Sequence, residues 1–596
     1  CHCLAAGFNE NLALFEVPFD VTVQDDFKKI PGSPVAYWLS DNARSTFERS
    51  KALAVIAPAK QGLATANNDR FVRYWFEVSQ AKIDLHSRSL TEAQNSLAKW
   101  FPYNKGGEFR RWYGNQDHLV NWANNGVEIR NFTDEQGNQR SRPQNTQCYF
   151  RASVSWSDIT SGISSFRFFP DGFVYDVTGM SAQPETHDQA LAVLAYANTP
   201  IVTWFTKTLN PTLHFQIGNF SSLPFLESAF GSRDFGFVET LISTAKTDWD
   251  AYERSWGFQS LPILTALSEH TPSLESSYIA WITRNRATIS EMKQLEEENN
   301  RVFIDAYGLR DELTPDVPIE QITLTVNPAY RYGGNLTEDE QWTRFRQDTM
   351  VELISYAIGC MMGRYSLDEP GLIYAHAGNV GFDPTRYPTF PADADGIVPI
   401  TDEFWFEDDA ANRVREFLRA VWGADTLDEN MAWLAESLGT KAGETPDETI
   451  RRYLADKFFK DHLQTYKKRP IYWLFSSGKQ GAFQALVYLH RYHEGTLARL
   501  RAEYVVPLTG KMQARIDMLE KDAAAAPSTA ARNKLNKQIE KLRKKHVELL
   551  AYDEKLRHYA DMRISLDLDD GVKANYGKFG DLLAEVKAVT GGAGDE

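Results

Sequence analysis

Side chains that could bind nucleic acid gather in residues 60–78, KQGLATANNDRFVRYWFEV. An asparagine amide can form two hydrogen bonds with adenine, whereas Arg and Lys bind guanine or phosphate oxygens. The polar first half of this stretch therefore predicts a loop that contacts DNA through Lys60, Thr65, Asn67, Asn68 and Arg70. The alternative is that Gly62 and the two asparagines only form a turn, which is a common local use of both residue types.

A buried strand is expected to support this loop. Residues 71–78 are dense in large apolar side chains, among them Phe71, Tyr74, Trp75 and Phe76. Bulky aromatic and β-branched residues fit a covered, pleated surface, so we predict a strand over residues 71–78. Such a strand would hold the polar loop on a rigid base.

Two further segments mix basic and aromatic residues, as nucleic-acid surfaces do. Tyr466 precedes a basic run, and Tyr472 and Trp473 follow it, although these rings could equally belong to the core. A second basic pair stands before Trp112 and Tyr113. The additional predicted DNA contacts are Arg110, Arg111, Lys467, Lys468, Arg469 and Lys479.

The net charge of −16 conceals a strong segregation of charge. Residues 364–448 hold 18 acidic and 6 basic residues, whereas residues 451–501 hold 11 basic and 3 acidic residues. Residues 96–156 hold 8 basic and 5 acidic residues. A segregated field of this kind can steer DNA to one face of an acidic protein. The alternative is that these charge runs are solvated faces.

Composition and periodicity favour an α+β fold with a mixed, strand-rich domain first, then a largely helical C-terminal region and a long αα-hairpin. Apolar spacing of 3.6 residues predicts helices over 190–205, 289–306 and 345–365, with Glu296, Glu297 and Glu298 facing water in the second. Shorter helices are expected over 413–418 and 431–438. Strands are expected over 214–220 and 471–475. Two polar helices over 497–525 and 530–557, broken at Pro527, predict the hairpin, with a narrow apolar stripe at Ile539, Leu542, Leu549 and Leu550.

Five segments follow from these patterns. Residues 1–30 read as strands at the tail of a preceding domain, and residues 31–230 as the α+β domain. Residues 231–345 form a helical connector, residues 346–510 a helical domain with acidic and basic sections, and residues 511–596 the hairpin arm and tail. The chain begins at Cys1 rather than Met, so we expect a piece of a longer protein.

The stretch over residues 60–78 resembles the signature KGLxTGxNxRFxRxWxEV of the PglX family, the adenine-specific DNA methyltransferases of BREX phage-defence systems. It is more distantly similar to fused restriction-modification enzymes. Ala66 and Ala152 stand where the family often has Gly. The segments that resemble the family in the same order are residues 27–41, 149–179, 198–225, 469–493 and 564–579.

The resemblance implies a role in DNA recognition and clamping within a site-specific enzyme that methylates adenine N6. S-adenosylmethionine would be the cofactor of the full-length parent, with no cofactor, metal or catalytic residue in this chain. The implied partners are double-stranded DNA, other BREX components and DNA-mimicking phage inhibitors, in the cytoplasm. The sequence contains no run of 18 or more apolar residues, so no membrane span is expected. The alternative from another class is a scaffold segment that binds other BREX components.

Several motifs depart from the functional patterns that they resemble. Asn327-Pro328-Ala329-Tyr330 is similar to the Asn-Pro-Pro-aromatic loop that holds a flipped adenine, but Ala329 replaces the second proline and no Gly-rich turn lies upstream. We predict a turn there, after a strand over 321–326, although an autonomous enzyme remains a third possibility.

Residues 567–570, in LDLDDG, lack the spaced ligands of a calcium loop and are expected to form a turn. Residues 478–481 fail the phosphate-loop pattern. Cys1-His2-Cys3 is expected to be ordinary sequence rather than a zinc site.

Overall fold

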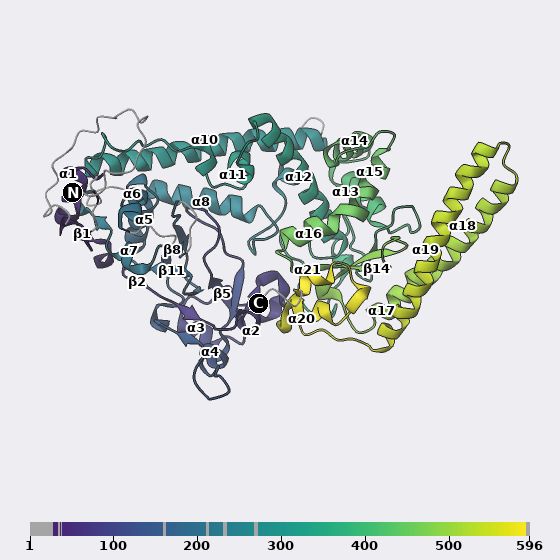
Figure 1. Cartoon of the computed structure of the whole chain (residues 1–596), viewed down its shortest axis with the longest axis horizontal. Helices are drawn as coiled ribbons and strands as arrows, with labels where there is room; N and C mark the ends of the chain where they lie inside the picture. The colour runs from purple at the N-terminus through teal and green to yellow at the C-terminus, as the bar shows by residue number, and fades with distance from the viewer. Residues whose placement is uncertain are drawn as a thin grey trace, which may run out of the picture.

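The structure is a computed structural model that describes residues 28–33, 36, 38–158, 163–209, 214–229, 235–266 and 272–591. The Cys1-His2-Cys3 segment and nearly all of the strands predicted for residues 1–30 lie outside this part of the chain. The fold is α+β, as predicted. A strand-rich region comes first, a helical region follows, and a helical hairpin projects from the second (Figure 1). Among the described residues, no helix has the length and apolar character needed to span a membrane.

Two four-stranded sheets form the early region, with strand orders β10-β5-β6-β4 and β2-β11-β8-β9. The first consists of β10 (Val174–Tyr175), β5 (Trp100–Asn104), β6 (His118–Asn121) and β4 (Val72–Tyr74). The second consists of β2 (Ala59–Lys60), β11 (Gly179–Ala182), β8 (Ser153–Ser157) and β9 (Arg167–Phe169). Among the residues that the structure describes here, two short strand pairs accompany these sheets: β1 (Lys51–Ala52) with β12 (Pro224–Phe225), and β3 (Leu63–Ala64) with β7 (Arg142–Pro143).

The strand predicted over residues 71–78 is wrong in extent. Phe71 ends a short helix, and β4 then pairs with β6 for only three residues, from Val72 opposite Val120. Trp75–Glu77 forms a 3₁₀ turn in which the Glu77 carboxylate accepts a hydrogen bond from the Tyr74 N–H at 3.0 Å. The large side chains are nevertheless buried, because the turn packs them against other elements rather than against a strand. Trp75 donates its indole N–H to the Arg254 carbonyl at 2.7 Å.

Helices surround this region. The long α10 (Leu274–Tyr307) and α8 (Gly236–Asp250) run across its top in Figure 1. The helix predicted over 190–205 is two helices, α5 (His187–Ala197) and α6 (Pro200–Leu209). The strand predicted over 214–220 is wrong, because α7 (Ile217–Ser221) begins there, where the Gln216 and Asn219 side chains cap each other's backbone. The remaining early helices are α1 (Asp41–Arg49), α2 (Asn68–Phe71), α3 (Leu90–Asn95), α4 (Ala123–Arg130) and α9 (Pro262–Thr265).

The helical region confirms most of the later predictions. Its helices are α11 (Pro328–Tyr332), α12 (Glu338–Met361), α13 (Ala410–Trp422), α14 (Leu427–Leu438), α15 (Pro446–Tyr453), α16 (Phe459–Thr465) and α17 (Thr496–Arg499). The aromatic strand is β14 (Tyr472–Ser476), which pairs with β15 (Gln484–Tyr488), and β15 pairs with β13 (Ile397–Pro399). Residues 321–326, in contrast, form no strand.

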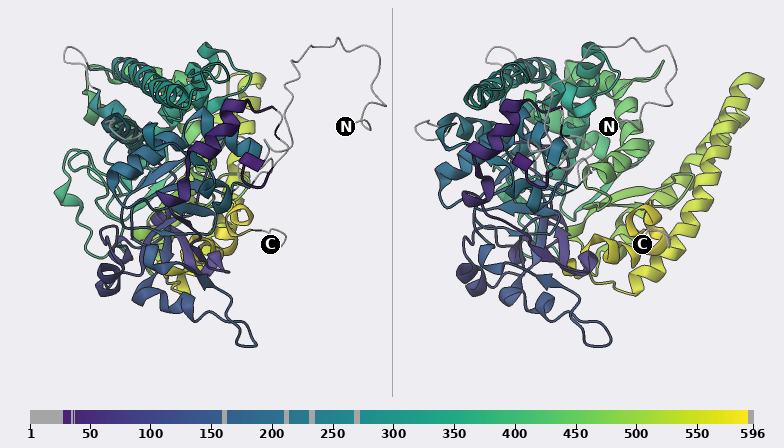
Figure 2. Two further views of the ribbon diagram at one scale, coloured as in Figure 1. Left: turned by 90° about the vertical axis from the view of Figure 1, so that its left-hand side faces the viewer. Right: turned by 60° about the vertical axis from the view of Figure 1, so that its left-hand side comes forward.

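The hairpin arm is α18 (Val506–Ala524) and α19 (Thr529–Asp561), and it projects from the body in Figure 1 and in the right-hand view of Figure 2. The turn lies at Pro527, as predicted, with Ser528 capping α19. Leu550 is 48% exposed, so it lies outside the apolar stripe predicted for it. A small core of its own joins the two helices, formed by Ile516, Leu519, Ala523, Ile539 and Leu542.

After the arm, the chain returns to the β10-β5-β6-β4 sheet, called the early sheet below, with α20 (Gly571–Gly577) and α21 (Val586–Thr590) (Figure 1). The LDLDDG segment forms the predicted turn, in which the Asp567 carboxylate accepts from the Asp569 N–H. The Asp569 carboxylate accepts hydrogen bonds from Lys82 at 2.7 Å, Trp100 at 2.9 Å and Lys99 at 3.2 Å. These hydrogen bonds attach the late segment, residues 567–591, to the β10-β5-β6-β4 sheet, which supports residues 60–71.

Candidate nucleic-acid interface

The predicted contact loop is held by its own polar side chains. The Asn67 side chain caps α2 by accepting from the Arg70 N–H at 3.0 Å. The Thr65 hydroxyl donates to Asn68 Oδ1 at 2.7 Å, and Thr65 itself is buried. Thr65 and Asn67 therefore shape the turn, as the alternative interpretation held. Asn68 and Arg70 are exposed and remain able to meet a ligand.

Gly62 is required at its position because the backbone passes directly against Tyr175. A Cβ atom there would lie 1.9 Å from the Tyr175 carbonyl oxygen. Ala66 has a φ of +56°, in the left-handed region that favours glycine. The structure thus gives a physical reason for Gly at the position of Ala66 in the family signature.

The basic run after α16 forms a tight turn. Lys467 and Lys468 both have positive φ, at +49° and +59°, and the Lys468 N–H donates to the Leu463 carbonyl at 2.7 Å. Lys468 is exposed. The Lys467 ammonium lies 3.0 Å from Glu108, and the Arg469 guanidinium lies 3.9 Å from Glu77. These two ion pairs place the basic turn beside the strand-rich region.

One groove brings two of the predicted segments together. Asn68 and Arg469 both line a hollow of about 470 Å³. Lys105 and Lys573, which the sequence did not single out, line it as well. Lys573 lies 3.2 Å from Asp69, and Lys105 lies 3.4 Å from Asp176. No local sequence signal marked either lysine, because each reaches the groove only through the tertiary fold.

Lys60 and Lys479 stand apart from this groove. Lys60 is exposed on β2, whose backbone pairs with Ser181 of β11. Lys479 is exposed in the turn of residues 477–482, at the base of the arm. Glu548 of α19 holds that turn by accepting from the Ser477 hydroxyl and the Gln480 and Ala482 N–H groups.

Arg110 and Arg111 lie in the interior, so the prediction that they contact DNA is wrong. Arg110 pairs with Asp248 at 2.6 Å, and Arg111 pairs with Glu296 at 2.7 Å. The Trp112 indole N–H donates to the other Glu296 oxygen, also at 2.7 Å. Glu296 is 2% exposed, which corrects the prediction that it faces water. Arg110 thus joins this segment to α8, and Arg111 and Trp112 join it to α10.

The Asn327–Tyr330 segment is engaged in structural bonds. The Asn327 side chain is 2% exposed, caps α11, and donates to the carbonyls of Ile319 and Ile322. The Tyr330 hydroxyl donates to the Phe109 carbonyl at 2.5 Å. The atoms that would hold a flipped adenine are already bonded to the backbone, so this segment does not fit a catalytic loop.

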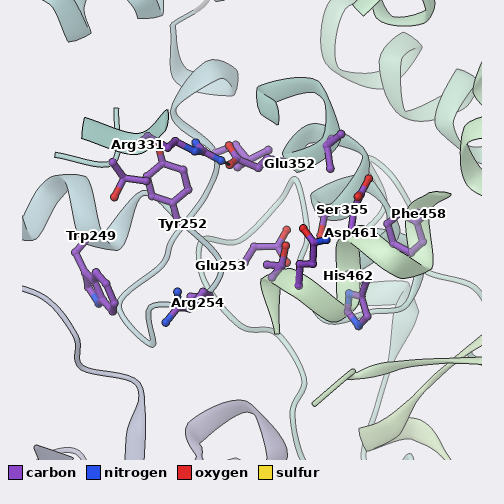
Figure 3. A pocket seen from close by; sticks show the side chains of 15 residues that line it. Trp249, Tyr252, Glu253, Arg254, Arg331, Glu352, Ser355, Phe458, Asp461 and His462 are labelled. Atoms are coloured by element: carbon purple, nitrogen blue, oxygen red, sulfur yellow. Dashed lines mark hydrogen bonds and ion pairs between the residues drawn. The ribbon is translucent and has the colours of Figure 1, made fainter. Parts of the chain in front are cut away.

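A second cavity, of about 280 Å³, lies between α8, α12 and α16. Glu253, Asp461 and His462 lie on one side of it and Trp249 and Tyr252 on the other (Figure 3). Burial lowers the pKa of His462 to about 3, and its Nε2 accepts from the N–H groups of Ile471 and Tyr472. Its imidazole thus fixes the start of β14 and does not serve as a base.

Glu253 makes the stability of the fold depend on pH. Burial raises the pKa of this carboxyl from 4.5 to about 7, although the Tyr466 hydroxyl donates to it at 2.7 Å. The folded state therefore binds the proton more tightly than the unfolded state, and the free energy of unfolding falls as pH rises from about 4.5 to 7.

Between pH 4.5 and 8, the unaltered chain should lose roughly 3 kcal/mol more stability than Glu253→Gln. Urea unfolding across this range measures the difference. Exposed Glu312→Gln is the control, and parallel pH profiles for all three proteins would contradict the assignment.

Comparisons with known proteins agree on one family. No protein-family model matches the chain. Over 587 residues it is 43% identical to an adenine-specific methyltransferase named BrxX from Escherichia coli O9:H4 (strain HS), covering 96% of this chain and 47% of that protein. It is 40% identical over 576 residues to an adenine-specific methyltransferase named PglX from Lacticaseibacillus casei (strain Zhang), covering 96% of this chain and 46% of that protein. The chain thus spans about half the length of the curated relatives it matches.

Proposed function

Because the chain belongs to the PglX family of adenine-specific methyltransferases, we propose that it is the part of such an enzyme that selects and clamps double-stranded DNA. The longer protein would methylate adenine N6 in a specific site, using S-adenosylmethionine bound outside this chain, as part of a BREX defence system. The hydrogen bonds from Asn327 and Tyr330 to backbone carbonyls support a catalytic site outside this chain. The five predicted segments remain part of the proposal, with residues 31–230 as the target-recognition domain.

One observation carries the proposal. Asn68 and Arg469 come from segments about 400 positions apart, yet they line a single groove with Lys105 and Lys573. Asn offers base-reading hydrogen bonds, and the cations offer phosphate contacts. Lys573 pairs with the exposed Asp69, and an exposed pair of this kind contributes little stability. A DNA phosphate can therefore replace that carboxylate, whereas Lys105 and Arg469 pair with the buried carboxylates of Asp176 and Glu77.

The basic turn gives the test of DNA binding. Replacing Lys467, Lys468 and Arg469 with alanine should weaken all duplex sequences alike. Each lost phosphate contact should flatten the slope of log affinity against log salt by about 0.9. Fluorescence anisotropy with a labelled duplex at several salt concentrations measures both quantities. Lys479→Ala, at the arm base, shows whether phosphate contacts extend that far. An unchanged slope in the triple variant would mean that the turn is only a solvated face.

A scaffold role is the second candidate, and the projecting arm favours it. Two long helices that leave the body present a large surface for another protein of the defence system. A gel shift separates the two candidates. Duplex DNA that is not retarded by the chain would favour the scaffold role.

A further inference from the structure

We propose that residues 132–142 form a hairpin that reads bases in the DNA major groove. The inference rests on the proposed DNA binding and deepens it by naming a specificity element. The segment that follows α4 forms the lowest point of the molecule in Figure 1, and it also projects in both views of Figure 2. It carries none of the residues that the sequence singled out as contacts.

The hairpin is preformed by its own hydrogen bonds. The Arg140 N–H donates to the Phe132 carbonyl, and the Asp134 N–H donates to the Asn138 carbonyl, both at 2.9 Å. At the tip, the Asp134 carboxylate accepts from the N–H groups of Gln136 and Asn138 at 3.0 and 2.8 Å. Gly137 completes the turn with a φ of +83°. Binding would therefore not have to order this segment.

The base of the hairpin is fixed to the predicted contact loop. The guanidinium groups of Arg70 and Arg140 each lie 5.4 Å from the centroid of the Phe132 ring. The Phe71 ring meets the same ring edge-on at 5.3 Å. Below this stack, β7 pairs with β3. The hairpin is thus packed against the loop with Asn68, so both would meet the same duplex.

The exposed side chains carry the chemistry of base recognition. Residues 135–140 and Arg142 are all exposed. Gln can pair with adenine, Arg with guanine, and a Glu carboxylate can accept from the amino group of cytosine. Glu135 stands at the tip, where a segment that only gripped phosphates would not place a negative charge. Glu135 and Gln136 are therefore the assigned reading residues.

The dimensions match the major groove. Gln136 is four positions beyond Phe132, and at roughly 3.3 Å a residue it lies at most about 13 Å from the aromatic stack. The major groove is about 8.5 Å deep and about 12 Å wide, and it admits a two-stranded ribbon. The tip can therefore reach base edges while the stack stays at the phosphate backbone.

Selection of bound duplexes from a randomised library, followed by sequencing, tests the assignment with the whole chain. Glu135→Ala and Gln136→Ala should each lose preference at one or two base pairs by roughly fivefold or more. Affinity for unselected duplex and its salt slope should change less than twofold. Lys468→Ala is the matched contrast and should weaken binding without changing the selected sequence. Thermal melting should be unchanged, because the altered side chains are exposed.

The outcomes separate the hairpin from the proposed function. If the chain selects a sequence and both hairpin variants select the same one with undiminished preference, the hairpin does not read bases but DNA binding stands. If the unaltered chain binds all duplexes equally, base reading by this hairpin is also wrong. If the chain binds no duplex at all, the proposed function fails, and the hairpin assignment fails with it.

Discussion

Replacing Arg111 with alanine should lower the free energy of unfolding by about 3–5 kcal/mol, because it leaves the Glu296 carboxylate buried without its cation. The two groups lie 2.7 Å apart, and both side chains are less than a tenth exposed. Burial already raises the pKa of Glu296, and the Arg111 charge opposes that rise. Urea unfolding followed by tryptophan fluorescence measures the loss.

Arg70→Ala is the matched control for this prediction. Arg70 is about half exposed, and its nearest carboxylate, on Glu128, is 3.7 Å away. An exposed pair of this kind contributes less than about 1 kcal/mol. If Arg111→Ala unfolded like the Arg70 variant while losing DNA binding, Arg111 would be a DNA contact after all.

Asp569→Ala should lower the free energy of unfolding by roughly 2–4 kcal/mol. This is somewhat less than the loss of a fully buried ion pair, because the lysines around Asp569 are partly exposed. Trp100 is fully buried, and its indole N–H would lose its acceptor. The late segment should then detach from the sheet and become sensitive to protease. Limited proteolysis, together with urea unfolding, measures both effects.

Asp570→Ala controls for the second prediction, since Asp570 is the exposed neighbour of Asp569. Burial tends to raise the pKa of Asp569, but hydrogen bonds from Lys82, Trp100 and Lys99 outweigh it, and the pKa is lowered. The stability that the ionised Asp569 carboxylate contributes to the fold is thus present above its unfolded pKa of 3.8. It is lost as pH falls below that value, through the lower pKa of the folded state. Equal stability of the Asp569 and Asp570 variants would show that the contact is not a clamp.

The long helices could be predicted because each carries its own periodic apolar face. Periodicity located α10, α12 and the arm without any knowledge of their neighbours. It failed at Glu296, whose partner Arg111 lies 185 positions away, because a buried carboxylate has the same local pattern as a solvated one. It also failed at residues 214–220, where mutual capping by Gln216 and Asn219 favours a helix over the apolar alternation.

The candidate interface was predictable only in part, for a related reason. Residue type indicated Asn68 and the basic turn, and both lie at the surface. The same reasoning chose Arg110 and Arg111, because a cation beside aromatic residues looks alike in sequence whether it faces solvent or a buried acid. Lys105, Lys573 and the hairpin tip were missed, since their positions depend on which distant segments the fold places beside them.

The docking of Asp569 on the early sheet also sets the order of events during synthesis. Arg73 donates to the Asp569 carbonyl across 496 positions of sequence. At roughly 5–20 residues per second, a ribosome needs about 25–100 s to make the intervening chain. During that time the sheet beneath residues 60–71 waits with Lys82, Lys99 and the Trp100 indole uncovered. Nascent chains stalled before residue 567 should therefore expose this surface to chaperones, and release of the finished segment should conceal it.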